Sequence, residues 1–441
     1  MLIGFDASRA FSAQNTGTEN YSLNLLRAFA EVDCKNHYRV YLRGFSRAKI
    51  PNLPNFPNLP NNFELRPIAP NRLWTQVGLA LETWRAPVDL LFVPAHTLPI
   101  LRRRKMGISN LQFTIYNSPK CVVTIHDLGV EYLPGYHKFP DRYYLDLASK
   151  YAAHHADRLI AVSESTKADL LKRYGVSGSQ VDVVYEGVDK GFFKPQSKGK
   201  VAVVKAKYKI SGDYFLYVGT VQPRKNLVFL IDVFNTLVKT NIVKRNNTKN
   251  NNVYQQITLI IAGKMGWNYE QIVRKGSDRV RFLGYVDRQD LPGLYSGAKA
   301  ALFPSVFEGF GLPILEALSS GCRVIASDIP VHRELFHTIT GGRGPITRGY
   351  MKPNFKFRFS SEKFSMSNFK FSKKKNKLEA MALANLNDEQ QWLSLLYQYV
   401  HDLDKSMTNT NTSLLRLDLF DWQTVAKETL EVFNGVVRAK K

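Results

Sequence analysis

The chain has 441 residues, more than one hydrophobic core usually organises, so we expect two domains of about 200 residues each. Hydrophobic residues make up 44% of the sequence and aromatic residues 12%, which excludes a disordered protein. The formal net charge is +24, and so large an excess of cations indicates an anionic partner or surface.

The start of the chain and its cysteines bear on where the protein works. No run of about 18 apolar residues occurs, and the first residues, MLIGFDASRAF, are typical of a buried strand rather than a signal peptide. We therefore expect a cytoplasmic protein. The three cysteines, Cys34, Cys121 and Cys322, are odd in number and widely spaced, and we interpret them as buried, inert thiols.

The first half of the chain alternates short apolar runs with helical patterns. Such alternation predicts strand-helix-strand units and a parallel sheet. A helix is predicted at 18–31, and another at 164–174, where Ser163 can cap the first turn and Gly175 can end the helix. The predicted strands of this half are 2–7, 38–42, 89–93, 121–125, 158–162 and 181–185.

The alternation weakens at 188–213, which we interpret as a connector, and restarts with a strand at 214–218. We therefore place a first domain at 1–190 and a second at 191–415. An amphipathic helix that starts at 421 ends the chain. The other predicted elements of this half are strands at 257–262, 280–283, 300–303 and 323–327 and helices at 225–239, 288–297 and 312–320.

One segment of the second half, AALFPSVFEGFGLPILEALSSGCRVIASD, takes a predicted strand through a glycine-rich loop into a helix that begins near Leu312. A helix start offers free N–H groups that suit a phosphate or a sugar hydroxyl, and Gly309 and Gly311 allow close approach. Two carboxylates would repel a diphosphate, so we expect Glu308 and Glu316 on either side of it, accepting bonds from hydroxyls. For either glutamate alone, a solvent-facing acid is the alternative.

The segment YVGTVQPRKNLVFLIDVF also passes from strand through loop to helix, with Arg224 and Lys225 at the helix opening beside Gly219. A guanidinium and an ammonium group together can neutralise a diphosphate without a metal ion. The alternative for each residue alone is an ordinary surface charge.

Three further positions of the first half lie at predicted strand ends. His126 and Asp127 follow the strand at 121–125, at the edge where open parallel sheets bind ligands, so His126 can bond a sugar hydroxyl or be structural. Gly17 precedes the first helix and is either a point of close ligand approach or a turn glycine. Ser163 is a helix cap or, alternatively, an acceptor contact.

Taken together, the motifs resemble the retaining glycosyltransferases of family 4, whose fold is called GT-B. The resemblance rests on the E-x7-E pair around Gly-Phe-Gly-Leu-Pro, the Gly-x4-Arg-Lys-Asn spacing and the His-Asp-Leu string. It covers about 1–335 and resumes near 378. It implies an α/β protein with two Rossmann-like domains, whose parallel sheets face a central cleft, and a final helix at 416–441 that crosses back to the first domain.

The resemblance also implies roles for single residues. Glu308 would contact the donor sugar and Glu316 the ribose hydroxyls, while Arg224 and Lys225 would clamp the diphosphate. The residues implied in catalysis are Arg224, Lys225, Glu308 and His126, and those on the acceptor side are His126, Asp127 and Ser163. The residues implied in donor binding are Gly17, Gly219, Arg224, Lys225, Tyr285, Val286, Glu308, Gly309, Phe310, Gly311, Leu312 and Glu316.

The implied activity is transfer of a mannosyl- or glucosyl-like group, with retention, from a nucleotide sugar such as GDP-mannose or UDP-glucose to a glycan or lipid-linked acceptor, in cell-surface polysaccharide or glycolipid synthesis. No other cofactor is expected, and a metal ion is not needed, since the Asp-x-Asp pair Asp402 and Asp404 lies far along the chain from the clamp. A nucleotide-sugar epimerase or hydrolase of the same fold is one alternative. A basic nucleic-acid-binding protein is another, but it leaves the two glutamates without a purpose, so we expect no nucleic acid partner.

The sequence departs from the family where a basic, phenylalanine-rich insertion at 341–377 replaces a short turn and strand. This insertion holds 11 basic residues and one acidic residue. With a second basic cluster at 102–105, it suggests reversible attachment to the anionic inner face of the plasma membrane, where a lipid-linked acceptor would lie. A solvated insertion is the alternative.

Overall fold

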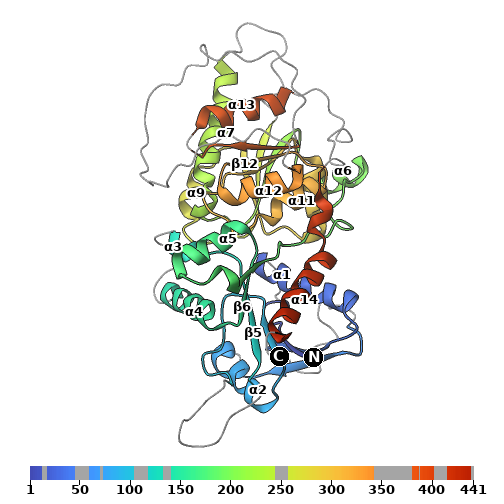
Figure 1. Ribbon diagram of the computed structural model, residues 1–441. Helices are drawn as coiled ribbons and strands as arrows, with labels where there is room; N and C mark the ends of the chain where they lie inside the picture. Colours follow the sequence, from blue (N-terminus) through green and yellow to red (C-terminus); the bar gives the residue numbers. More distant parts are fainter. Residues whose placement is uncertain are drawn as a thin grey trace, which may run out of the picture.

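The computed structural model describes most of the chain and shows two α/β domains stacked end to end, the first below the second in Figure 1. The predicted insertion beyond Gly341, and Asp402 and Asp404, lie outside the described residues. The described residues are 1–11, 17–44, 59–69, 73–103, 118–132, 141–243, 257–341, 380–386, 388–401 and 415–438.

The first domain is built on a seven-stranded sheet in the order β3-β2-β1-β4-β5-β6-β7, in which every neighbouring pair is parallel. Its central strands are buried almost throughout because helices cover both faces, as an all-parallel sheet requires. The strands are β1 (Leu2–Asp6), β2 (His37–Arg43), β3 (Phe63–Ile68), β4 (Leu90–Val93), β5 (Lys120–Ile125), β6 (Arg158–Ala161) and β7 (Val181–Val183).

Two helical layers cover this sheet. One face packs against α1 (Gly17–Val32) and the C-terminal helix α14 (Trp422–Arg438), through Phe5, Phe29 and Phe433 among others. The other face packs against an outer layer, which consists of the π-helix η2 (Trp74–Leu79), α2 (Ala80–Arg85), α4 (Asp141–His155) and the π-helix η3 (Leu170–Tyr174). The remaining helices of this domain are α3 (Gly129–Tyr132), α5 (Glu164–Asp169) and the short η4 (Gly178–Gln180).

The second domain repeats the plan with a six-stranded parallel sheet in the order β10-β9-β8-β11-β12-β13. Within each domain the order reverses beside the first strand, which is the doubly wound pattern. The strands are β8 (Tyr214–Val218), β9 (Thr258–Ala262), β10 (Val280–Gly284), β11 (Ala301–Phe303), β12 (Val324–Ser327) and β13 (Met381–Ala384).

Helices also cover both faces of the second sheet. One face packs against α7 (Leu227–Val243) and α13 (Glu389–His401) around the buried Trp392. The other packs against α10 (Leu291–Gly297), α11 (Leu312–Ser319) and α12 (Pro330–Thr340). The remaining helical elements are α6 (Lys198–Lys207), η5 (Pro223–Lys225), α9 (Glu270–Arg274), η7 (Arg288–Asp290) and η10 (Leu417–Phe420).

Two chain segments connect the domains, and they are bonded to each other. The first leaves β7, and the second enters α14 through η10; Val188 N donates to Phe420 O at 2.7 Å. Helix α14 then runs along α1 and so returns the chain to the first domain (Figure 1). None of the described helices is long and apolar enough to span a bilayer.

The predicted strands all form, within a few residues at their ends, but two strands were missed. β3 has only one fully buried residue, and β13 has four residues, so neither gives a clear apolar run. The interval interpreted as a connector contains helix α6. This helix has no buried residue, so its sequence lacks the apolar periodicity from which a helix is predicted. Cys121 and Cys322 are buried as expected, but the prediction for Cys34 is wrong, because this thiol is exposed.

Candidate functional site

The carboxyl ends of the two sheets face each other across a cleft with a volume of about 1260 Å³. Loops that follow β1 and β4 line it from the first domain, and loops that follow β8 and β11 line it from the second. Both pairs of strands flank the point where the strand order reverses, which is where open α/β sheets bind ligands. The cleft therefore brings both switch points of the molecule together.

The two predicted cations enter the cleft on a single turn of helix, η5, just after β8. Gly219 turns the chain at φ +151°, and Asn226 at φ +54° separates η5 from α7. A Cβ atom on Gly263, after β9, would lie 1.9 Å from Gly219 O, so the two strand ends touch through glycine alone. This close packing fixes the loop that carries Arg224 and Lys225.

Glu308 binds both cations. Arg224 Nη1 donates to Glu308 Oε2 at 2.9 Å and to Phe307 O at 3.1 Å, and Lys225 Nζ donates to Glu308 Oε1. Ser305 Oγ also donates to Glu308 Oε1, at 2.6 Å. The sequence analysis did not predict this pairing, in which the carboxylate of Glu308 joins two cations that would otherwise repel each other.

The electrostatics of this cluster favour an anionic ligand. Burial alone would raise the pKa of Glu308, but the charges of Lys225 and Arg224 outweigh burial and hold that pKa well below its usual range. Burial, together with the charge of Arg224, lowers the pKa of Lys225 to about 8. With one carboxylate against two cations, the cluster keeps a net positive charge at neutral pH.

The N-terminus of helix α11 lines the same cleft as this cluster. Gly311, at φ +113°, turns the chain into the helix, Pro313 occupies its first turn, and no described side chain caps this end. Gly309 lines the cleft, as predicted, and has a further role that the sequence did not show. A Cβ atom there would lie 1.8 Å from His126 O, so the contact between the domains also requires glycine at this position.

Glu316 lies on α11 and lines the same cleft as Arg224 and Glu308, as predicted. Tyr295 donates a long hydrogen bond of 3.4 Å to Glu316 Oε2. Burial raises the pKa of Glu316 to about 7, although the charge of Arg288 acts in the opposite direction. A carboxyl group that is half-protonated near neutral pH, with one weak partner, has acceptor capacity left for hydroxyl groups.

If Glu316 accepts hydrogen bonds from ribose hydroxyls, as the family resemblance implies, its pKa makes nucleotide binding depend on pH. As the pH falls through 7, Glu316 takes up a proton and accepts hydrogen bonds less well, so we expect its contribution to nucleotide affinity to fall several-fold from pH 8 to pH 6. Lys225, with a pKa of about 8, gains charge over the same range and acts in the opposite direction, so the contribution of Glu316 is measured against a variant that keeps Lys225. Glu316→Gln should bind more weakly at pH 8 and show a flatter profile. Calorimetric titrations of both proteins across this range test the prediction, since their difference removes the nucleotide's own titration. Parallel profiles would contradict it.

His126 follows β5 and lines the cleft, but both of its ring nitrogens are engaged. Nδ1 lies 2.8 Å from Glu186 Oε1 and Nε2 lies 3.1 Å from Pro94 O. Each nitrogen therefore has a protein partner within hydrogen-bond distance. The predicted bond from His126 to a sugar hydroxyl would require one of these bonds to break.

Ser163 takes the capping role. Its Oγ accepts from Thr166 N at 3.0 Å and donates to Gly309 O across the domain interface at 2.8 Å. It is fully buried and does not line the cleft, which leaves no surface for an acceptor contact. The other predicted residues that line the cleft are Gly17, Asp127, Gly219, Tyr285, Val286, Phe310 and Leu312.

The sequence analysis missed several polar residues of the cleft. The guanidinium carbon of Arg288 lies 4.5 Å from the ring centroid of Phe192, and its charge acts on Glu316. Arg288 Nε has no hydrogen-bond partner in the described part of the chain. The ring centroid of His96 lies 5.6 Å from that of His126. Burial, and in second place the charge of His126, lowers the pKa of His96 to about 3. Glu186 holds His126. In the sequence, the only indication that these residues line the cleft is that each follows the end of a strand.

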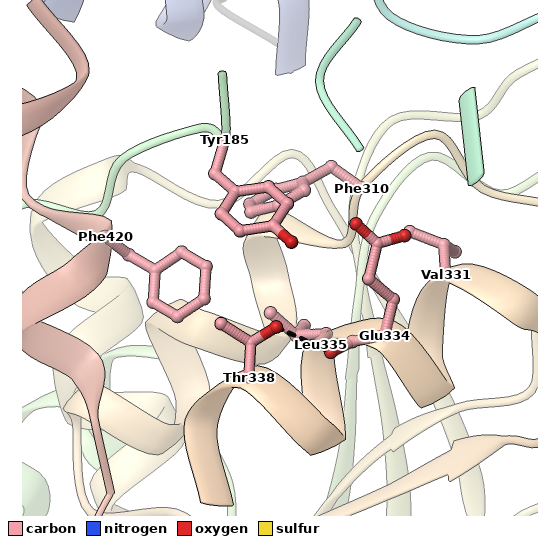
Figure 2. A pocket seen from close by; sticks show the side chains of 7 residues that line it. All are labelled: Tyr185, Phe310, Val331, Glu334, Leu335, Thr338 and Phe420. Carbon is pink, nitrogen blue, oxygen red and sulfur yellow. Dashed lines mark hydrogen bonds between the residues drawn. The ribbon is translucent and has the colours of Figure 1, made fainter. Parts of the chain in front are cut away.

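The loop of Glu308 also contacts both connections between the domains (Figure 2). Phe310 lies with its ring centroid 5.8 Å from that of Tyr185 and 5.9 Å from that of Phe420. Below them, Glu334 of α12 accepts from the backbone N–H groups of residues 164 and 165, at 2.7 and 3.0 Å. The space between these side chains has no room for a water molecule, so it is a packed contact between the domains rather than a ligand site.

Within the described ranges, no three His, Cys, Asp or Glu side chains gather as metal ligands.

Two family profiles match the chain. The family described as "Glycosyltransferase Family 4" matches residues 15–192, and "Glycosyl transferases group 1" matches residues 204–341. The first match covers most of the first domain and the second contains Arg224, Glu308 and Glu316.

Curated relatives and solved structures are also similar. O-antigen chain mannosyltransferase B of Escherichia coli is 28% identical over 54% of this chain and 63% of its own length. O-antigen chain mannosyltransferase RfbU of Salmonella typhimurium is 27% identical over 73% of this chain and 80% of its own. Sucrose-phosphate synthase from Thermosynechococcus elongatus superposes with a TM-score of 0.64 at 17% identity, over 99% of each chain. Anabaena HepE in complex with UDP and glucose gives 0.62 at 17% identity, over 99% of this chain and 100% of its own.

Proposed function

Because the chain belongs to the family 4 glycosyltransferases of group 1 and has their GT-B fold, we propose that it transfers a hexosyl group from a nucleotide-diphosphate sugar to a glycan or lipid-linked acceptor. The observation that carries the proposal is the shared cleft, which Arg224, Lys225, Glu308 and Glu316 line together with the start of α11. The relatives named O-antigen mannosyltransferases support a mannosyl-like group and a role in cell-surface polysaccharide synthesis.

In the proposed mode of binding, the donor lies along the second domain. Its diphosphate lies between the two cations and the N-terminus of α11, where positive charge and backbone N–H groups converge. Glu316 accepts hydrogen bonds from the ribose hydroxyls, and the base lies beyond it near Tyr285 and Val286. Arg288 is beside Glu316, so we add it to the residues that contact the nucleoside.

In the proposed reaction, the bond between the anomeric carbon and the diphosphate oxygen breaks as negative charge gathers on the leaving diphosphate. Arg224, Lys225 and the start of α11 stabilise that charge. The acceptor hydroxyl attacks from the first domain on the same face, so configuration is retained, and the diphosphate takes up the hydroxyl proton. The positive charge comes from the protein, so the proposal assigns no role to a metal ion.

The acceptor side belongs to the first domain, near His96, Asp127 and the loop after β1. The bonds of His126 to Glu186 and Pro94 suggest that it positions this side of the cleft rather than donating to the substrate. The net charge of +24 favours binding to an anionic surface. We therefore propose that the enzyme works on the anionic inner face of the plasma membrane, where a lipid-linked acceptor would lie.

The proposal predicts a specific donor. In a thermal-shift screen of GDP, UDP and ADP sugars, one nucleotide should stabilise the protein strongly, because a ligand at 100 times its Kd contributes about 2.7 kcal/mol. That donor should then give transfer to a lipid-linked saccharide. No stabilisation by any nucleotide sugar would contradict the proposal.

The same assay separates the alternatives. An epimerase or hydrolase of this fold would convert the donor at full rate without an acceptor, which product analysis would reveal. A nucleic-acid-binding protein would show salt-dependent binding to DNA or RNA and no response to any donor.

A further inference from the structure

The outer layer of the first domain carries an unusual concentration of exposed apolar side chains. Fourteen large apolar residues are exposed in the described ranges. Eight of them lie on η2, α2, α4 and the loop at 99–103, and a ninth, Leu73, directly precedes η2. Scattered single apolar residues are normal on a protein surface, whereas a contiguous group marks an interaction site.

The first part of this group follows one side of a helix. Leu73, Val77, Leu81 and Trp84 are spaced by four, four and three residues, so they share one side of η2 and α2. Leu73 is 70% exposed, although core-facing neighbours such as Trp74 and Leu79 are buried. This helical segment therefore has a buried apolar side and a second apolar side that is partly exposed to solvent.

The loop at 99–103 extends this surface toward α4. Trp84 Nε1 donates to Leu101 O at 2.9 Å, and Ile100 N donates to Gln76 Oε1 at 2.9 Å, which fixes the loop against the helix. Leu101 is 73% exposed and Ile100 is 47% exposed, although hydrogen bonds fix the backbone of their loop to the helix.

Arg102 ties the same loop to α4. Its guanidinium is buried and donates to His155 O at 2.7 Å and to Tyr151 OH at 3.0 Å, which corrects the assignment of this arginine to a free basic cluster. Further along α4, Tyr143, Tyr144 and Leu147 are 63%, 48% and 65% exposed. The two helices and the loop form one surface, here called the docking face.

The charges around the docking face are cationic. Arg85 directly follows Trp84 and is exposed, and Arg103, which is half-buried, ends the loop at 99–103. Glu82 on the same helix is buried and paired with Arg66 at 2.9 Å, and Asp146 on α4 is paired with Lys150 at 3.0 Å. The neighbouring arginines thus keep their charge for a negatively charged surface, while these carboxylates are neutralised within the protein.

We propose that the docking face of η2, α2, the 99–103 loop and α4 binds the surface of an anionic phospholipid bilayer. Leucine side chains bury themselves below the headgroups, Trp84 and the two tyrosines lie at headgroup level, and the arginines contact lipid phosphates. Leu145 and Ser149 of α4 line the cleft, so the bilayer would adjoin the acceptor side. The inference rests on the proposed function only in taking the acceptor to be lipid-linked.

The test is co-flotation of the full-length protein with vesicles of phosphatidylcholine, with and without phosphatidylglycerol. We expect binding to the anionic vesicles that weakens with salt, and we expect Leu73→Ser/Leu101→Ser to weaken it at least tenfold. Val203→Ser is the matched control, because Val203 is also 70% exposed but lies on α6 of the second domain. It should bind as the unchanged protein does.

Two results would overturn the inference. One is equal vesicle binding by the double variant and the unchanged protein. The other is self-association in solution that the double variant abolishes while neither protein binds vesicles, which would make the face a contact between two copies of the chain. Nucleotide affinity, measured in parallel without vesicles, should be the same in all proteins. If the unchanged protein bound no nucleotide, that result would count against the proposed function rather than against the docking face.

Discussion

Arg224→Ala is expected to lower kcat/KM for transfer by about a hundredfold or more, the usual cost of removing one donor from a preorganised anion site. Arg224 and Lys225 form ion pairs with Glu308 in a part of the cleft that is only slightly exposed to solvent. When the arginine is removed, the leaving diphosphate loses a cation, and Glu308 keeps only one positive partner. Both effects disfavour charge on the diphosphate.

The comparison needs a control that removes the same charge elsewhere. Lys275→Ala removes a lysine that is 46% exposed and pairs with Asp232 on the outer surface of the second domain. Steady-state kinetics should show unchanged kcat/KM for this variant. If Arg224→Ala transferred sugar as well as Lys275→Ala does, the assignment of the clamp would be wrong.

Gly309→Ala is expected to reduce kcat/KM by about a hundredfold through the domain interface. The added Cβ would lie 1.8 Å from the backbone oxygen of His126, and neither backbone segment can move alone, because Ser163 also binds Gly309 O. The domains must therefore separate locally, and a shift of about 1 Å in a reacting group can cost about a hundredfold in rate. Each domain keeps its own core, so the protein should still fold.

Gly199→Ala is the matched control, since a Cβ there meets nothing within 4 Å and the residue lies on α6. Transfer rates and circular dichroism of both variants check the prediction. A folded Gly309→Ala protein with full activity would show that this interface contact plays no part in transfer.

The sequence motifs predicted which parts of the second domain meet, because motif residues at strand ends of a doubly wound sheet converge on one edge. Arg224, Glu308 and Glu316 line one cleft for that reason. The pairing of Glu308 with both cations was not predictable, since it depends on side-chain positions that the spacing leaves open.

The contacts between the domains could not be predicted from the sequence. Gly309 is a glycine of a ligand-binding motif, yet its missing side chain makes room for His126 of the other domain. Ser163 was correctly recognised as a possible cap, but its bond to Gly309 joins residues 146 positions apart. Likewise, short strands such as β13 depend on pairing with a neighbour, here β12, rather than on their own apolar pattern.

A crystal structure of the protein with its nucleoside diphosphate tests the central claim most directly. We predict that the diphosphate oxygens lie within hydrogen-bond distance of Arg224, Lys225 and the first backbone N–H groups of α11, with the ribose hydroxyls on Glu316. A nucleotide bound outside this cleft, or bound in it with its diphosphate turned away from Arg224 and Lys225, would contradict the account.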